Sequence, residues 1–297
     1  MIRVENVEKS FDGFKALDRL NMTIPDGAVY GLIGPNGAGK STIIRHLAGI
    51  YRQDAGTITI DGAPVYENPA IKNEIAYVPD DPHYFFQASI RDMMKFYKGI
   101  YEKFDEDRFN KLREAFSLDE KRPMRKLSKG MQKQAAFWLM LSIHPRVLIL
   151  DEPLDGLDPV MRRQVLSLIM GDVAEYGTTV LVSSHNLREL EDVCDHVGII
   201  HKGRTLLERS LSELQGNTVK VQLVYPEGQE LPGGLEVLHS SKSGKVQTHI
   251  IRGSTEEIEN SIAASGPLFY DMVPLTLEEI FIYEMGGSAY AVKDIIL

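Results

Sequence analysis

The spacing of hydrophobic positions changes several times along the chain, and each spacing predicts a different kind of element. The N-terminal residues 1–7 alternate, and the apolar run over 22–33 is broken by a Pro25-Asp26-Gly27 turn, which predicts strands on either side of it. The segment GTITIDGAPV, residues 56–65, predicts a hairpin that turns at Asp61-Gly62. The continuous apolar runs in RVLILDEP (146–153) and TTVLVSSH (178–185) are typical of central parallel strands buried on both faces.

Between these strands the apolar residues recur at helical spacing. A helix is predicted after residue 42, helical structure from Ser89 to about His144, and a further helix over 159–176 that ends at Gly177. Ser89 and Asp92 are spaced as a capping box, and we expect core packing for an apolar stripe of Met93, Met94, Phe96, Tyr97 and Ile100. Alternation of strands and helices predicts a mixed α/β sheet with helices on both faces.

The pattern changes again near residues 215–217. Short alternating stretches beyond this point predict strands, and the segments STEEIENSIAASG and TLEEIFIYEMGG predict helices. In the second helix Thr276 and Glu279 are spaced as a capping box, and Gly286 marks the predicted end. We therefore expect a main domain over 1–215, with a helical subdomain at about 89–144, and a small α+β accessory domain over 217–297.

Composition narrows the possible functions. The 297 residues are 43% hydrophobic and 25% charged, as in ordinary globular proteins, and the net charge of −9 argues against a general nucleic-acid-binding surface. The single cysteine, Cys194, excludes an internal disulfide and fits a reducing compartment. The N-terminus does not resemble a signal peptide, and no apolar run approaches the roughly 18 residues that span a bilayer. We expect any membrane role to depend on a partner protein.

The strongest chemical signal is GPNGAGKST, which matches the phosphate-binding pattern G-x-x-x-x-G-K-[ST] between an apolar strand and a helix. Glycines let backbone N–H groups converge on phosphate oxygens, and the following helix adds its positive end. Lys40 is expected to reach the β- and γ-phosphates and Ser41 to bind Mg²⁺. The predicted nucleotide-binding residues of this loop are Gly34, Pro35, Asn36, Gly37, Ala38, Gly39, Lys40, Ser41 and Thr42.

A second signal is the buried strand that ends in Asp151-Glu152. Downstream of a phosphate loop, a carboxylate at the end of such a strand holds the metal, so Asp151 is the predicted second Mg²⁺ ligand. Glu152 is then placed to orient or polarise the attacking water. Together these two segments predict a nucleoside triphosphate hydrolase that uses Mg²⁺.

Three more segments follow in order: LSKGMQKQ (127–134), LDGLD (154–158) and SSH (183–185). With the two above, they resemble the motifs of ATP-binding subunits of ABC transporters over nearly the whole of the first 215 residues. The resemblance implies an α/β P-loop NTPase of the ABC type, with a β-subdomain and a helical subdomain. The variants YVPDDP and LSKGMQ and the segment LTLEEIFIYEMGG are most similar to a bacterial exporter-type subgroup that includes Ytr-type and bacitracin-resistance-type proteins.

The resemblance implies further roles. His185 would contact the γ-phosphate, although a histidine that ends a strand is often only structural, and Phe11 would stack on adenine. Asp158, in the LDGLD segment, is assigned to the nucleotide site. Ser128 and Gly130, at the start of a long helix, would meet the γ-phosphate bound by the opposite subunit of a head-to-tail dimer. Lys129, where the family pattern has Gly, is expected to face solvent, with an added cation near the phosphate as the alternative.

The segment YVPDDPHYFF, residues 77–86, departs from the family pattern. Asp80 stands where the family has a glutamine that senses Mg²⁺ and water, and two readings are open: a carboxylate in the metal shell, which we favour, or a solvated loop acid. Asp81 is expected to be solvated. The aromatic residues that follow are candidates for docking a membrane partner, with core packing as the alternative: His83, Tyr84, Phe85 and Phe86. Ser183 and Ser184 are expected to be loop residues without a catalytic role.

The predicted function is therefore the ATP-binding and ATP-hydrolysing subunit of an ABC transporter, at the cytoplasmic face of the membrane. Its expected partners are a transmembrane permease and a second ATPase, identical or homologous, and not a nucleic acid. Two alternatives remain open: a soluble ABC-type ATPase in translation or DNA repair, and a regulatory subunit that binds ATP without hydrolysing it.

Overall fold

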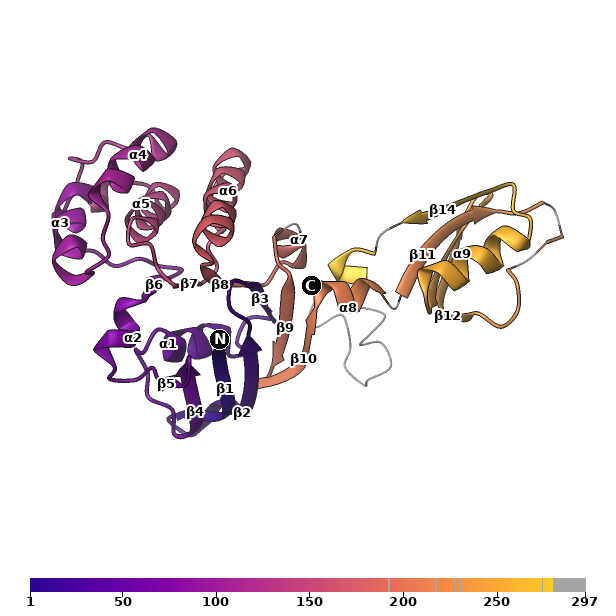
Figure 1. Ribbon diagram of the computed structural model, residues 1–297, viewed down its shortest axis with the longest axis horizontal. Helices are drawn as coiled ribbons and strands as arrows, with labels where there is room; N and C mark the ends of the chain where they lie inside the picture. The colour runs from indigo at the N-terminus through magenta and orange to yellow at the C-terminus, as the bar shows by residue number, and fades with distance from the viewer. Residues whose placement is uncertain (192, 217, 227, 230, 274, 280–297) are drawn as a thin grey trace. The chain divides into compact units, whose positions relative to one another are not determined.

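The computed structural model in Figure 1 describes residues 1–191, 193–216, 218–226, 228–229, 231–273 and 275–279. The contacts within the chain divide it into two compact units, Met1–Glu208 and Arg209–Leu297. The residues of all the predicted nucleotide-site motifs belong to the first unit, so this unit positions the candidate site.

One sheet of the first unit is antiparallel and has the strand order β2-β1-β4-β5. Its strands are β1 (Ile2–Phe11), β2 (Phe14–Ile24), β4 (Ala55–Ile60) and β5 (Ala63–Pro64). Ile60 pairs with Ala63 across the Asp61-Gly62 turn, so the predicted hairpin is confirmed. The inward-facing residues of β1 and β2 are fully buried, as the alternation predicts.

The second sheet has the order β10-β9-β3-β8-β7-β6. Its strands are β3 (Val29–Ile33), β6 (Ile75–Val78), β7 (Val147–Leu150), β8 (Thr179–Ser184), β9 (His196–His201) and β10 (Arg204–Ser210). The strands β9, β3, β8, β7 and β6 are paired in parallel. Every residue of β3, β7 and β8 is buried, which confirms the predicted central strands. Ser183 and Ser184 are the buried end of β8, so their prediction as loop residues is wrong: the strand continues past its apolar run.

Helices cover both faces of this sheet (Figure 1). Helix α1 (Lys40–Leu47) lies between the two sheets, where Ile43, Ile44 and Leu47 share one apolar core with β1, β2, β3 and β7. On the opposite face of β3, Gly31 allows close approach of the segment around α7 (Leu187–Leu190), because a Cβ there would lie 3.0 Å from Sγ of Cys194. Two further helices of the first unit are α2 (Pro69–Asn73) and α6 (Pro159–Tyr176), and α6 ends at Gly177 as predicted.

The region between β6 and β7 is helical and consists of α3 (Ile90–Ile100), α4 (Glu106–Phe116), a 3₁₀ turn (Met124–Lys126) and α5 (Lys129–Leu141). Ser89 and Asp92 form the predicted capping box at the start of α3. Met93 and Met94 are buried, whereas Phe96 and Ile100 are exposed, so core packing is wrong for these two. The Phe96 ring packs instead on Phe85, which is itself exposed, with 4.8 Å between ring centroids.

The second unit contains a four-stranded antiparallel sheet of order β12-β13-β11-β14. Its strands are β11 (Thr218–Val224), β12 (Glu236–Ser243), β13 (Val246–Arg252) and β14 (Phe269–Val273), and its helices are α8 (Leu211–Gly216) and α9 (Thr255–Ala264). Ile258 and Ile262 of α9 pack on the buried residues of β11 and β13. Thr276 and Glu279 make the reciprocal hydrogen bonds of the predicted capping box, and Gly286 lies outside the described residues.

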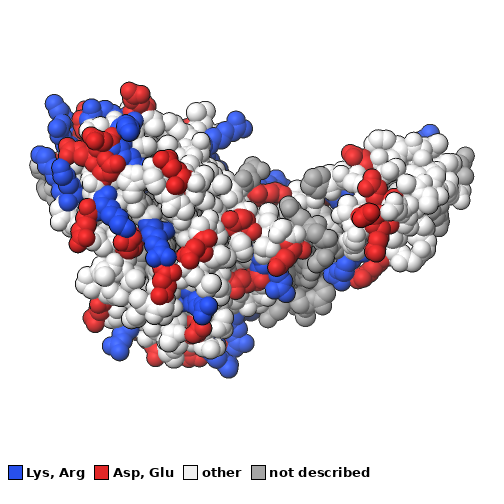
Figure 2. Space-filling view, in the orientation of Figure 1, with Lys and Arg blue, Asp and Glu red and all other residues white. Residues whose placement is uncertain are grey.

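On the face shown in Figure 2, acidic and basic side chains are interspersed over the first unit. Among the described residues, no helix combines the length and the apolar character needed to cross a bilayer. The only cysteine of the sequence, Cys194, is buried as a free thiol, and this burial raises its pKa.

Candidate nucleotide and hydrolysis site

The phosphate loop connects the end of β3 to the start of α1. Gly37 and Gly39 have positive φ angles of 80° and 111°, a conformation that side chains disfavour, and Gly39 immediately precedes the first helical residue, Lys40. A Cβ at Gly34 would lie 2.3 Å from the carbonyl oxygen of Ile200. The fold therefore requires glycines here for its own packing, in addition to their predicted role in bringing backbone N–H groups to phosphate.

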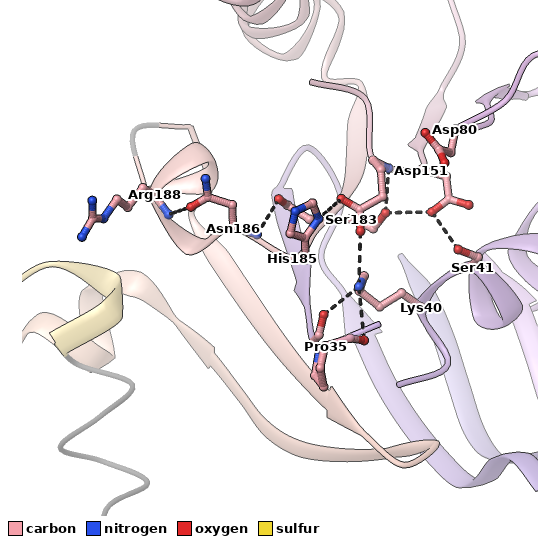
Figure 3. Close-up of polar contacts among 12 residues, drawn as sticks. Pro35, Lys40, Ser41, Asp80, Asp151, Ser183, His185, Asn186 and Arg188 are labelled. Carbon is pink, nitrogen blue, oxygen red and sulfur yellow. Dashed lines mark hydrogen bonds and ion pairs between the residues drawn. The ribbon is translucent and has the colours of Figure 1, made fainter. Parts of the chain in front are cut away.

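Lys40 lies inside this loop and is only 6% exposed. Its Nζ donates hydrogen bonds to the carbonyl oxygens of Gly34, at 2.6 Å, and Pro35, at 3.5 Å, and lies 3.2 Å from Oε1 of Glu152 (Figure 3). A buried ammonium needs such acceptors because burial deprives it of water. The same ammonium is available to phosphate oxygens in exchange for the Glu152 carboxylate.

Asp151 follows β7 and is almost fully buried. Its Oδ1 accepts hydrogen bonds from the hydroxyls of Ser41, at 3.2 Å, and Ser183, at 2.9 Å (Figure 3). Burial raises the pKa of this carboxyl, the two hydroxyls oppose the shift, and the neighbouring charges of Glu152 and Asp80 add to it. The structure thus brings together Ser41 and Asp151, two of the three predicted metal ligands.

Every polar group of Glu152 has a hydrogen-bond or ion-pair partner. Its backbone has φ 45°, in the left-handed region that residues other than glycine rarely adopt. Its N–H donates to Oγ of Ser183 at 2.9 Å, and its carbonyl oxygen accepts from Nζ of Lys133 at 2.6 Å. Its carboxylate lies 3.2 Å from Lys40 Nζ and 3.0 Å from Nδ1 of His185. The three residues predicted to be catalytic therefore form one cluster.

Asp80 lies just beyond the end of β6, and its side chain is 60% exposed. Its Oδ1 is 3.1 Å from Nζ of Lys133, a residue of α5 with a side chain only 6% exposed. Neither of the two readings from sequence included this ion pair. Whether the carboxylate also belongs to a Mg²⁺ shell stays a prediction, and Asp81 is exposed as expected.

The signature segment forms the start of α5. Ser128 is exposed and caps the helix, its Oγ accepting from the N–H of Met131 at 3.3 Å. A Cβ at Gly130 would lie 2.6 Å from the carbonyl oxygen of Gly156, so this glycine lets the helix pack against the LDGLD segment. Lys129 is exposed, in line with the expectation that it faces solvent. At the other end of LDGLD, Asp158 caps α6 by accepting from the N–H groups of Val160 and Met161.

The remaining predicted site residues have simpler surroundings. Phe11, the last residue of β1, is 38% exposed and packs edge-on against Tyr51, with 5.4 Å between ring centroids. Asn36 is exposed, Pro35 is half-buried, and Ala38 is buried, with its carbonyl accepting from the N–H of Gly203. The carbonyl of Thr42 lies 2.7 Å from Nδ1 of His46.

Sequence reasoning missed two residues that contact this cluster, Ser183 and Lys133. Ser183 bonds both to the Asp151 carboxylate and to the Glu152 backbone, and a signal for it was its place two residues before the predicted His185 at the end of a parallel strand. Lys133 carried a weaker signal, since it is a charged residue among the apolar positions of a buried helix. Both act on neighbours that are distant in sequence.

Comparison with known proteins identifies the family of the chain. The sequence profile of the ABC transporter family matches residues 17–155. The ABC transporter ATP-binding protein YtrB of Bacillus subtilis (strain 168) is 31% identical over 289 residues, which cover 97% of this chain and 99% of that protein. The bacitracin transport ATP-binding protein BcrA of Bacillus licheniformis is 32% identical over 72% of this chain and 71% of its own. These matches confirm the predicted subgroup.

The first unit also has solved counterparts. A structure of the ATP-binding subunit of an ABC transporter matches with a TM-score of 0.68 and 26% identity, covering 72% of this chain and 92% of that chain. This likeness confirms the predicted P-loop fold. The chain belongs to the ATP-binding proteins of ABC transporters, and it is an ATPase subunit of that family.

Proposed function

We propose that this protein is the cytoplasmic ATPase of a transporter in which a separate permease crosses the membrane, and that it works peripherally at the inner face. The observation that supports this most directly is the cluster of Lys40, Glu152 and His185 beside the Ser41–Asp151 pair. The domain limits that we propose for it are 1–215 for the ATPase and 217–297 for the accessory domain.

Ser41 and Asp151 are the proposed ligands of a Mg²⁺ ion. Their oxygens already approach within 3.2 Å, and a hydroxyl with a carboxylate is the donor set that Mg²⁺ takes from proteins while keeping several waters. When bound with ATP, the ion would neutralise charge on the β- and γ-phosphate oxygens. Burial raises the pKa of Asp151, and a bound cation would favour the ionised form of this carboxyl.

Hydrolysis transfers the γ-phosphoryl group of ATP to water and yields ADP and phosphate. In our proposal Lys40 and the loop N–H groups bind the phosphates, with Phe11 stacking on adenine. Glu152 accepts a hydrogen bond from the attacking water and orients it, and the imidazole of His185, whose Nδ1 lies 3.0 Å from Glu152, contacts the γ-phosphate. The buried Lys40 places positive charge where the transition state accumulates negative charge.

A second ATPase subunit, identical or homologous, is the proposed partner across the nucleotide. Ser128 is exposed at the positive end of the 13-residue helix α5, a position suited to a phosphate bound by another copy. Asp158 is exposed in the adjacent segment and would lie in the same interface. Because Gly130 holds these two segments together, they would meet the partner as one surface.

The permease contact is proposed at a surface that we call the aromatic patch, which consists of Phe85, Phe86 and Phe96. Phe86 is 80% exposed and Phe85 56% exposed, with Arg125 lying over the Phe86 ring at 4.7 Å. Exposed apolar side chains that gather in one place mark interaction sites. The patch follows Asp80 in the chain, so it can report events at the nucleotide to a bound partner. Tyr84 is instead anchored by a bond to the carbonyl of Gln132.

Steady-state hydrolysis of ATP with and without Mg²⁺ tests the catalytic part of the proposal. Glu152→Gln keeps the size of the side chain but not its charge, and we expect turnover to fall by about 10²-fold or more while ATP still binds. Unchanged turnover would contradict the role of Glu152, and turnover without divalent cations would contradict the metal site.

Co-purification from native membranes tests the partner part. We expect the protein to be recovered with a multi-pass membrane protein, and Phe86→Ser to weaken that recovery while leaving the ATPase rate of the isolated subunit unchanged. Recovery with ribosomes or DNA instead would favour the soluble ABC-type ATPases. A purified protein that fails to hydrolyse ATP even with its permease would favour a regulatory subunit.

A further inference from the structure

The backbone of Glu152 is fixed by two side chains from different parts of the first unit. Ser183 of β8 accepts from its N–H at 2.9 Å, and Lys133 of α5 donates to its carbonyl at 2.6 Å. The φ angle of 45° is one that a glutamate holds only when its surroundings impose it. The direction of the Glu152 carboxylate therefore depends on both contacts.

Lys133 is an unusual residue for its position. Its residue exposure is 5%, and lysine is rarely buried because its ammonium is strongly hydrated. The ammonium has two acceptors in the structure, the Glu152 carbonyl and the Asp80 carboxylate at 3.1 Å. The segments around these acceptors follow β6 and β7, which are adjacent in the parallel sheet, while Lys133 comes from the helical region. One side chain thus joins three segments at the site.

We propose that Lys133 is a positioning residue for ATP hydrolysis. Its ammonium holds the Glu152 backbone and neutralises Asp80, and so it fixes the positions of these two acidic residues relative to each other. This inference rests on the role of Glu152 in the proposed function. The Asp80–Lys133 ion pair then keeps the segment after β6 beside the hydrolysis site. Asp80 is then tolerated beside the metal ligand Asp151 because a buried cation offsets its charge.

The charge of Asp80 affects the behaviour expected of the single variants. Val78 pairs with Leu150, and the N–H of Asp151 donates to the carbonyl of Val78 at 2.9 Å, so Asp80 and Asp151 lie just beyond the same ends of two adjacent strands. Loss of the Lys133 ammonium leaves Asp80 without its buried counter-charge, and a free carboxylate beside a metal site attracts the cation. Loss of both charges together removes this second effect and leaves only the missing bond to the Glu152 carbonyl.

Four variants separate these effects: Lys133→Met, Lys133→Arg, Asp80→Asn and the double variant Lys133→Met/Asp80→Asn. For Lys133→Met we expect kcat to fall by about tenfold or more, with KM for ATP changed by less than about twofold, because the bond acts on the catalytic step. Lys133→Arg keeps a cation and a donor and should retain at least about a third of the turnover. Lys111→Met, an exposed lysine of the same helical region, is the matched control and should match the parent.

The Mg²⁺ dependence gives a readout that a purely structural role would not change. We expect the Mg²⁺ concentration for half-maximal rate to fall by about threefold in Lys133→Met and to return to the parent value in the double variant. A kcat for folded Lys133→Met within about twofold of the parent would overturn the proposal. It would also be overturned if melting temperature and ATP binding fell in step with turnover, since Lys133 would then only support the fold.

Glu152→Gln, measured in parallel, separates this inference from the proposed function. If Glu152→Gln abolishes turnover while Lys133→Met does not, the role of Glu152 stands and the positioning role of Lys133 is wrong. If Glu152→Gln retains turnover, the catalytic assignment of Glu152 is wrong, and the inference about Lys133 is overturned with it.

Discussion

Two buried lysines reach the same glutamate from different parts of the fold. Lys40 comes from the phosphate loop and contacts the Glu152 carboxylate, whereas Lys133 comes from α5 and contacts the Glu152 backbone. Both ammonium groups are almost excluded from water. The two lysines differ in whether a ligand can replace their partner. Lys40 faces the place where phosphate would bind, whereas Lys133 contacts groups of the protein itself. A buried charge can therefore serve substrate binding or the geometry of a catalytic residue.

Removal of the first lysine should have the largest effect. Lys40→Met is expected to lower turnover by about 10³-fold and to weaken ATP binding as well, because in the proposed mechanism this ammonium contacts the phosphates in both the ground state and the transition state. Nucleotide binding and steady-state rates measure the two effects. An unchanged ATP affinity in Lys40→Met would show that Lys40, like Lys133, does not bind the nucleotide.

The next test moves α5 without changing any charge. A Cβ at Gly130 would meet the carbonyl of Gly156 at 2.6 Å, so Gly130→Ala should push the start of α5 away from the LDGLD segment. We expect kcat to fall by about tenfold and stability to fall by about 1–3 kcal/mol. Thermal unfolding and ATPase assays check both, and Gly99→Ala, where a Cβ would meet nothing within 4 Å, is the control for added volume.

Ser183→Ala should resemble Lys133→Met more than Lys40→Met. It removes the acceptor of the Glu152 N–H and one donor to the buried Asp151, which costs about 1–3 kcal/mol of stability for the groups left unpaired. We expect kcat to fall by about fivefold with KM for ATP nearly constant. A change confined to KM would show that Ser183 does not position Glu152.

The smallest effect concerns stability and pH. Because burial raises the pKa of Asp151, the folded protein binds this proton more tightly than the unfolded chain, so stability falls as pH rises from about 4 through the raised pKa. Asp151→Asn should then raise the melting temperature by about 2 °C at neutral pH without divalent cations. Equal melting temperatures of the two proteins from pH 4 to pH 8 would contradict the shift.

Much of the fold could be predicted because its signals are local. The hairpin at Asp61-Gly62, the cap at Ser89 and the end of α6 at Gly177 depend on residues within a few positions of each other. The same holds for the phosphate loop, where strand, glycines, lysine and helix are contiguous. A motif of this kind predicts a ligand-binding segment well when one short stretch of the chain supplies all of the contacts.

The contacts that the sequence does not predict also share a cause, because they join residues that are far apart in the chain. Lys133 contacts residues that lie 19 and 53 positions away, and Ser183 contacts residues 31 and 32 positions away, so packing alone brings them together. Periodicity predicts core packing for Phe96, which is exposed, because it shows which side of a helix is apolar and not what lies opposite that side. The pairing of Asp80 with Lys133 likewise needed the position of α5.

The carboxylate of Glu152, held between Lys40 and His185, has a further consequence. A γ-phosphate that enters this place brings no new counter-charges together, because it takes over partners that already serve a carboxylate. If the proposed site roles hold, nucleotide binding exchanges one anion for another, and its free energy includes the difference between two sets of ion pairs. On this proposal Glu152 becomes free to orient the water only after phosphate has replaced its carboxylate at Lys40 and His185, so the catalytic carboxylate is released only when substrate is bound.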